Sequence, residues 1–194
     1  MKRHFVVLAI IMCGVASVSL AATPNAPETL QIEKFDDALL SAMKLSQGRP
    51  GALSPTVEQT FNFSVMAQFL VGIPWSGMPP TDRASLIGAL ERYTVARLAF
   101  RFDHFANQQF VVDPDVKERG LDRLVKTQLL TPGDDPIHID YRMREYDGSW
   151  RVIDVYSEGV SLLTTQRADV SSTLETGGPA ALVAKLQQAA DQLH

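Results

Sequence analysis

HIDYRMREYDGSWRVIDVY, residues 138–156, decides the fold, because apolar and polar side chains alternate along it on both sides of Asp147-Gly148. Alternation with a period of two is typical of β-strands that have one buried and one exposed face. A two-residue Asp-Gly turn between two such runs is a strong signal for a β-hairpin. We therefore expect two antiparallel strands, over residues 138–144 and 150–156.

The same period of two occurs earlier in the chain. Residues 121–130 alternate in this way, with Val125 and Leu129 on one face, and Phe110–Val112 begins another extended segment. Together with the hairpin, these segments predict an antiparallel meander of three or four strands.

Segments whose apolar residues recur at helical spacing flank the predicted strands. Proline and glycine residues separate them, including a loop at 72–80 around Trp75. Helices that flank an antiparallel sheet indicate an α+β fold, here a curved antiparallel sheet wrapped by helices. The expected helices run from Leu30 to Leu45, from Ser54 or Thr56 to Val71, from Thr81 to Asn107, from Ser161 to Thr176 and from Pro179 to Leu193.

The first residues have the features of a secretory signal peptide. A basic start, an apolar run over residues 5–18 and the small-residue site Ser19-Leu20-Ala21 fit this class of segment. The run is shorter than the roughly 20 apolar residues that a membrane helix needs. We expect residues 1–21 to be a cleaved signal peptide and residues 22–194 to be a single domain. Cys13 is the only cysteine, so the exported domain would contain no disulfide.

The charge of the expected mature chain argues against nucleic acid as a partner. Removing Lys2 and Arg3 leaves 16 of the 18 basic residues against 22 acidic ones, a net charge near −6. Proteins that bind a duplex carry clustered lysine and arginine on one face, and this chain has no such cluster.

Catalytic and metal-binding motifs are missing from the sequence. Ser161 lies in Glu158-Gly-Val-Ser-Leu162, which lacks the second glycine of a nucleophile elbow. His138 and Asp140 would share a strand face, but no third metal ligand follows at a diagnostic spacing. No phosphate-binding loop is present. We expect no enzyme activity, no metal and no cofactor.

Asp154 is the one carboxylate that merits comparison of two roles. By alternation it shares a strand face with Trp150, Val152 and Tyr156, where a buried carboxylate could act as a general base. The alternative, which we favour, is a structural aspartate that pairs with an arginine such as Arg142 or Arg167, or caps a nearby turn.

Large apolar side chains on the predicted sheet and the long helix suggest a binding cleft. A curved sheet with a helix across its face leaves a hollow, and hollows lined in this way bind apolar ligands. Each methylene of an acyl chain buried there contributes about 0.8 kcal/mol. The residues expected to line a lipid pocket are Trp75, Tyr93, Phe100, Val125, Leu129, Ile139, Tyr141, Met143, Trp150, Val152 and Tyr156.

Several short motifs follow one another in a set order: Phe61–Met66, Phe69–Gly72, Trp75, Asp140-Tyr141, Asp147–Trp150, Asp154-Val155, Glu158–Leu162, Arg167 and Gly177-Gly178. This order resembles that of the toluene-tolerance/MlaC family. The N-terminal half has an aromatic, Met, Leu-Gly and Trp pattern, although Asn62 replaces a usual Asp. Within the family, Glu91–Ala96 and Gln166–Asp169 are most similar to the hopanoid-associated branch, HpnM.

This resemblance implies a nuclear-transport-factor-like sheet with a helical subdomain that encloses acyl chains. It further implies a periplasmic carrier that passes phospholipid, or a hopanoid-type lipid, between an outer-membrane lipoprotein complex and an inner-membrane MCE-domain ABC transporter. The residues leave two alternatives open. One is a small α+β enzyme that uses Asp154, and the other is a structural or chaperone-like envelope protein without a bound small molecule.

Overall fold

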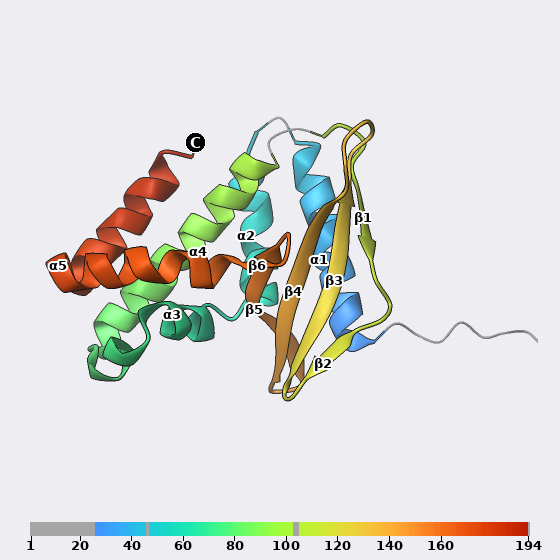
Figure 1. Ribbon diagram of the computed structural model, residues 1–194. Helices are drawn as coiled ribbons and strands as arrows, with labels where there is room; N and C mark the ends of the chain where they lie inside the picture. The colour runs from blue at the N-terminus through green and yellow to red at the C-terminus, as the bar shows by residue number, and fades with distance from the viewer. Residues whose placement is uncertain (1–25, 46, 103–104, 194) are drawn as a thin grey trace, which may run out of the picture.

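The computed structural model describes residues 26–45, 47–102 and 105–193, and it confirms the predicted α+β class. The predicted signal peptide, residues 1–21, lies outside the described residues. Figure 1 shows a curved antiparallel sheet with helices against one face and beyond one edge. The strands are β1 (Gln109–Val112), β2 (Lys117–Arg119), β3 (Asp122–Leu130), β4 (Ile137–Tyr146), β5 (Ser149–Ser157) and β6 (Val160–Ser161).

The sheet is a meander in the order β1-β3-β4-β5-β6, and β2 pairs with β3 beside β1. Every pairing between these strands is antiparallel. The predicted hairpin joins β4 to β5 at Asp147 and Gly148, whose φ angles are 49° and 75°. Two positive φ angles in a two-residue turn match the twist of the flanking strands, which is why Asp-Gly occurs there. β2 and β6 were not predicted, because two or three residues are too short to show a period.

A β-bulge at Ile153 interrupts the pairing of β4 with β5. Arg142 lies opposite Asp154 and Met143 lies opposite Val152, so Ile153 has no residue of its own across the ladder. One extra residue in a strand moves every following side chain to the other face.

The predicted strand face of β5 is therefore wrong beyond the bulge. Trp150 and Val152 share the face of Met143, as expected, but Asp154 and Tyr156 lie on the opposite face. Their place on the core side is taken by residues 155 and 157.

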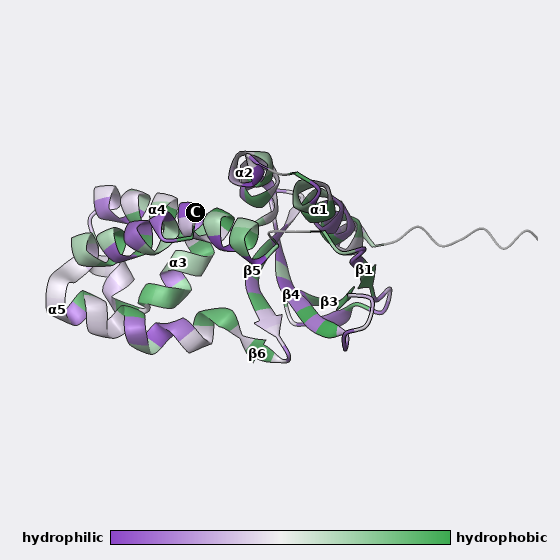
Figure 2. Cartoon of the chain, turned by 90° about the horizontal axis from the view of Figure 1, so that it is seen from above, coloured by the Kyte–Doolittle hydropathy of each residue, from purple (hydrophilic) through white to green (hydrophobic). Residues whose placement is uncertain are grey.

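The helices form two groups, seen from above in Figure 2. α1 and α2 lie over one face of the sheet, whereas α3, α4 and α5 gather beyond β5 and β6. A short 3-10 helix, η1, fills part of the predicted loop after α3. The helices are α1 (Pro27–Met43), α2 (Arg49–Thr60), α3 (Phe63–Val71), η1 (Ile73–Gly77), α4 (Pro80–Arg101) and α5 (Leu162–Asp191).

The second predicted helix is in fact two helices. α2 starts earlier than expected, with Pro50 in its first turn, and it ends at Thr60. The backbone N–H of Asn62 then donates to the carbonyl of Val152 at 2.9 Å, which ties the break to β5. The Asn62 side chain accepts a hydrogen bond from the N–H of Val65 at 3.1 Å and caps α3. The break thus depends on a tertiary contact.

The last two predicted helices are the two arms of α5, which bends at Gly178. The φ of Gly178 is 68°, a value that favours glycine, and Pro179 occupies the first turn of the second arm. An ion pair of 2.5 Å between Arg92 and Asp191 connects the end of this arm to α4. The α4 helix itself ends at Arg101, earlier than predicted. None of the helices in the described part of the chain is long and apolar enough to cross a membrane.

Candidate functional site

A cavity of about 340 Å³ lies between the sheet and the helices, and it is partly open to solvent. Its sheet wall comes from β3, β4 and β5, and its helical wall comes mainly from α1, α4 and the first turns of α5. Apolar side chains make up most of the lining, namely Phe35, Leu39, Phe61, Met66, Leu90, Leu98, Phe102, Leu129, Ile137, Ile139, Val155, Leu162 and Leu163.

Four of the predicted pocket residues line this cavity: Tyr93, Leu129, Ile139 and Tyr141. The last three lie on one face of β3 and β4, because a period of two holds along both strands. Tyr93 approaches from α4 on the other side. The structure therefore brings together residues that are far apart in the sequence.

Val125, Met143 and Val152 share the sheet face of the cavity but do not reach it. Their exposed fraction is 0%, and they belong to the hydrophobic core between the sheet, α1 and α2. A side chain on the correct strand face can thus be core or cavity wall, depending on how far along the strand the helices cover it.

Four other predicted pocket residues lie elsewhere. Trp75 is in η1 under the guanidinium group of Arg83, 5.4 Å from its ring centre, and Trp150 lies similarly under Arg123. Phe100 projects from α4 into solvent with an exposed fraction of 58%. Tyr156 is on the far face of the sheet because of the bulge at Ile153. Helical spacing alone could not show which side of α4 faces the cavity.

The sequence-based prediction missed most of the helical wall and three strand residues, Ile137, Val155 and Ser157. Phe35 of α1 packs edge-on against Tyr141, with ring centres 6.0 Å apart, and against Phe61 at 5.3 Å. The apolar spacing of α1 was visible in the sequence, but its packing partner was not. Val155 was missed because the bulge reverses the alternation before it.

A buried carboxyl group lies directly behind the cavity wall. Asp36 of α1 is 2% exposed, and its Oδ1 accepts a hydrogen bond of 3.4 Å from the hydroxyl of Tyr141. Its Oδ2 is buried without a partner among the described residues. Burial, together with the nearby charges of Asp37 and Glu33, raises the pKa of Asp36 to about 8, against the Tyr141 hydrogen bond. Burial of Tyr141, together with the neighbouring Asp36, raises the pKa of the Tyr141 hydroxyl.

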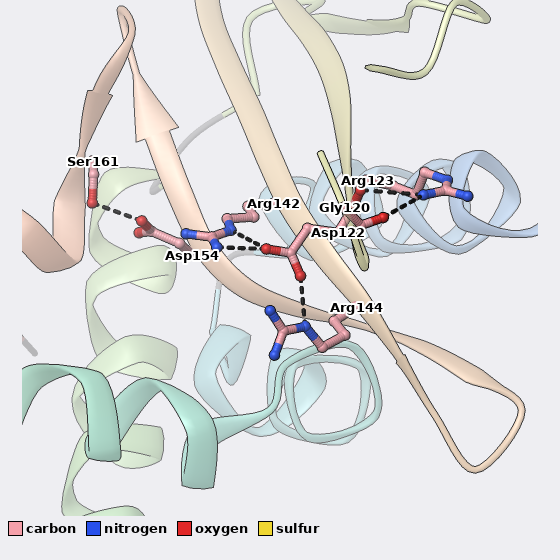
Figure 3. Close-up of polar contacts among 7 residues, drawn as sticks. All are labelled: Gly120, Asp122, Arg123, Arg142, Arg144, Asp154 and Ser161. Carbon is pink, nitrogen blue, oxygen red and sulfur yellow. Dashed lines mark hydrogen bonds and ion pairs between the residues drawn. The ribbon is translucent and has the colours of Figure 1, made fainter. Parts of the chain in front are cut away.

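The opposite face of the sheet carries a charged cluster centred on Asp122 (Figure 3). This carboxylate is 2% exposed and accepts hydrogen bonds from the Nε atoms of Arg142 and Arg144, both at 2.6 Å. Burial alone would raise the pKa of Asp122, but the two guanidinium groups outweigh it and lower the pKa below its usual value. The cluster stiffens the start of β3 against β4.

The family model of the MlaC protein matches residues 33–188, which run from α1 into the second arm of α5. The chain belongs to the MlaC family. A solved structure of a phospholipid-binding protein from Ralstonia solanacearum, in complex with a phospholipid, is similar in fold. Its TM-score is 0.74 at 21% sequence identity, and the match covers 87% of this chain and 99% of that one.

Asp154 of this MlaC-family chain accepts hydrogen bonds from residues near the start of α5. Its Oδ2 accepts a hydrogen bond from the Ser161 hydroxyl at 2.7 Å, and its Oδ1 accepts one from the N–H of Val155 at 2.8 Å. The Ser161 hydroxyl in turn caps α5 by accepting from the N–H of Thr164. Asp154 therefore fixes the start of α5. The expected pairing with Arg142 is wrong, because Arg142 pairs with Asp122.

We predict that Asp154→Asn weakens this anchor without changing what the cavity holds. An amide still accepts from Ser161 but is a weaker acceptor, so the free energy of unfolding should fall by about 1 to 3 kcal/mol. Thermal melting and lipid content, measured on the same preparation, test this. A folded, lipid-loaded Asp154→Asn protein that docks normally but fails to complement a deletion strain would instead favour the enzyme alternative.

Proposed function

We propose that this MlaC-family protein is a periplasmic lipid carrier that holds acyl chains in the cavity between the sheet and the helices. The observation that carries the proposal is the lining of that cavity, which is predominantly apolar and reaches solvent on one side. An empty cavity of this kind lacks the packing contacts of a protein interior. An apolar ligand supplies those contacts and so stabilises the folded protein. The phospholipid held by the Ralstonia solanacearum protein, which is similar in fold, is consistent with this.

The proposed route follows the family resemblance. The chain would leave the cytoplasm by a cleaved signal peptide, residues 1–21, and act as the soluble component of an ABC transport system. Its partners would be an inner-membrane MCE-domain ABC transporter complex and an outer-membrane lipoprotein complex. Each buried methylene contributes about 0.8 kcal/mol, so two acyl chains bind firmly while the protein stays in water.

A hopanoid-type lipid is the second candidate cargo. It rests on the resemblance of Glu91–Ala96 and Gln166–Asp169 to the HpnM branch. Gln166 lines the cavity, so this local likeness falls on a residue that would touch the cargo.

Organic extraction of protein purified from the periplasm is expected to release lipid in near-stoichiometric amount. Val155→Glu should abolish lipid binding in the cavity, because placing a charge beside acyl chains and away from water is costly. Tyr156→Glu is the matched control, since this neighbouring residue is also half-buried but lies on the other sheet face. Lipid content is measured by mass spectrometry and folding by thermal melting.

Two results would contradict the carrier. One is recovery of empty wild-type protein from an envelope that contains ample lipid. The other is a folded Val155→Glu protein that keeps as much lipid as Tyr156→Glu, which would place the cargo outside this cavity.

A further inference from the structure

A second cavity, of about 260 Å³, lies on the opposite face of the sheet from the cavity proposed to hold lipid. Its walls come from α3, the far faces of β4 and β5, and the first turn of α5. Among the described residues, Leu163 is the only one that lines both cavities. The second cavity is therefore a separate site. Its lining residues are Val65, Gln68, Phe69, Arg142, Arg144, Ile153, Asp154 and Leu163.

The lining of the second cavity combines apolar side chains with two cationic ones. Val65 and Phe69 of α3 supply part of the apolar surface. Arg142 and Arg144 are two residues apart on β4, so their side chains leave the same face of the strand and reach the same cavity. The cavity is smaller than most small-molecule sites, which suits a small ligand rather than a lipid.

Asp122 holds the two guanidinium groups in place from outside the cavity lining (Figure 3). It accepts hydrogen bonds from the Nε atoms of Arg142 and Arg144, both at 2.6 Å, and Nη2 of Arg142 lies 2.5 Å from it. The hydroxyls of Tyr156 and Tyr146 are further partners of the pair. These few oxygens cannot accept from every N–H group of two guanidinium groups, so donors remain for a ligand. Because the pair is already fixed, binding costs little side-chain entropy.

Asp154 is the one acidic residue in the lining of the second cavity, and both of its oxygens are engaged. They accept hydrogen bonds from the Ser161 hydroxyl at 2.7 Å and from the N–H of Val155 at 2.8 Å. Asp154 and Asp122 together balance the formal charges of the two arginines. An anion would therefore be held by the fixed N–H donors that point at it rather than by an excess of positive charge.

We propose that the second cavity binds a small organic oxyanion, namely a carboxylate or phosphate ester that carries a short apolar group. The planar guanidinium groups of Arg142 and Arg144 match the oxygens of either anion in geometry. The side chains of Val65, Phe69 and Leu163 would pack against the apolar group. This ligand is distinct from the lipid cargo, and its site does not depend on the proposed carrier function.

Benzoate and phenyl phosphate are suitable probes, and an NMR titration of the purified, isotope-labelled protein locates their binding. Both should shift the signals of Gln68 and Arg144. Benzyl alcohol has the same ring without a charge and should bind at least about 10-fold more weakly, since hydrogen bonds to an ionised group are stronger than neutral ones.

Gln68→Glu tests the site without disturbing the arginine cluster, because Gln68 is exposed on α3. The added carboxylate repels the anion and competes for the guanidinium groups, so benzoate should bind about 3- to 10-fold more weakly. Gln188→Glu is the matched control. It makes the same change at an exposed position of α5 outside the cavity lining and should bind benzoate as wild type does.

Either of two outcomes overturns the proposal. Equal affinity of wild type for benzoate and benzyl alcohol would show that the cavity does not recognise an anion. Equal affinity of Gln68→Glu and Gln188→Glu for benzoate would show that the anion binds elsewhere. Neither outcome involves lipid content, so the carrier function would stand in both cases.

Discussion

Asp36→Asn is expected to stabilise the protein at pH 8 and to remove most of the decline in stability that wild type shows between about pH 4 and pH 8. In wild type the folded state holds the Asp36 proton up to a pKa of about 8, whereas the unfolded state releases it near 3.8. Between these values the folded state binds more protons, so the free energy of unfolding falls as pH rises and levels off above about pH 8. The decline is on the order of 5 kcal/mol.

Urea unfolding at a series of pH values from 4 to 9 measures this effect. Asp135→Asn is the control, because this carboxyl is exposed and is not among the charges that shift the pKa of Asp36, so it should leave the pH profile unchanged. The prediction is wrong if the free energy of unfolding falls with pH equally in Asp36→Asn and in wild type. Asp36 would then ionise at no cost in stability, and its carboxylate would have to contact water or a cation in the folded protein.

Asp122→Ala is expected to lower the free energy of unfolding at pH 7 by about 3 kcal/mol. The change leaves Arg142 and Arg144 side by side on β4 without their shared partner. The loss lies at the low end for broken buried pairs, because both guanidinium groups are about one-third exposed, at 35% and 36%. Since the pKa of Asp122 is lowered in the folded state, its contribution is present above about pH 4 and is lost as pH falls through that lowered value.

Denaturant unfolding at pH 7 and at pH 3 tests both parts of this prediction. The difference between wild type and Asp122→Ala should shrink at the lower pH. Asp140→Ala, on the same face of β4 but outside the cluster, should change stability by less than about 1 kcal/mol. An Asp122→Ala protein as stable as Asp140→Ala would mean that the two arginines find other partners.

The meander was predictable because the period of two is a local property. It holds through β3 and β4, so Leu129, Ile139 and Tyr141 were correctly placed on one face. It fails in β5, where the bulge at Ile153 depends on the pairing with β4 and has no signal in the composition of the strand. This one bulge explains why the prediction placed Tyr156 in the cavity and left Val155 out.

The helical wall of the cavity could not be predicted from the sequence, for a different reason. Spacing shows that α1 and α4 each have an apolar side, but it does not show which residues of that side reach the cavity. Phe35 was therefore overlooked, and Phe100 was assigned inward although it faces solvent. The split between α2 and α3 also needed a partner, the carbonyl of Val152 on β5.

The bulge in β5 decides which of two neighbouring residues faces the cavity and which one holds α5. Val155 faces the cavity, while its neighbour Asp154 faces away and fixes the start of α5 through Ser161. Substitutions at Val155 can reshape the room for cargo while the anchor of α5 stays intact. Related proteins with this backbone can therefore differ in the cargo that fits the cavity and still keep the hydrogen bond that starts α5.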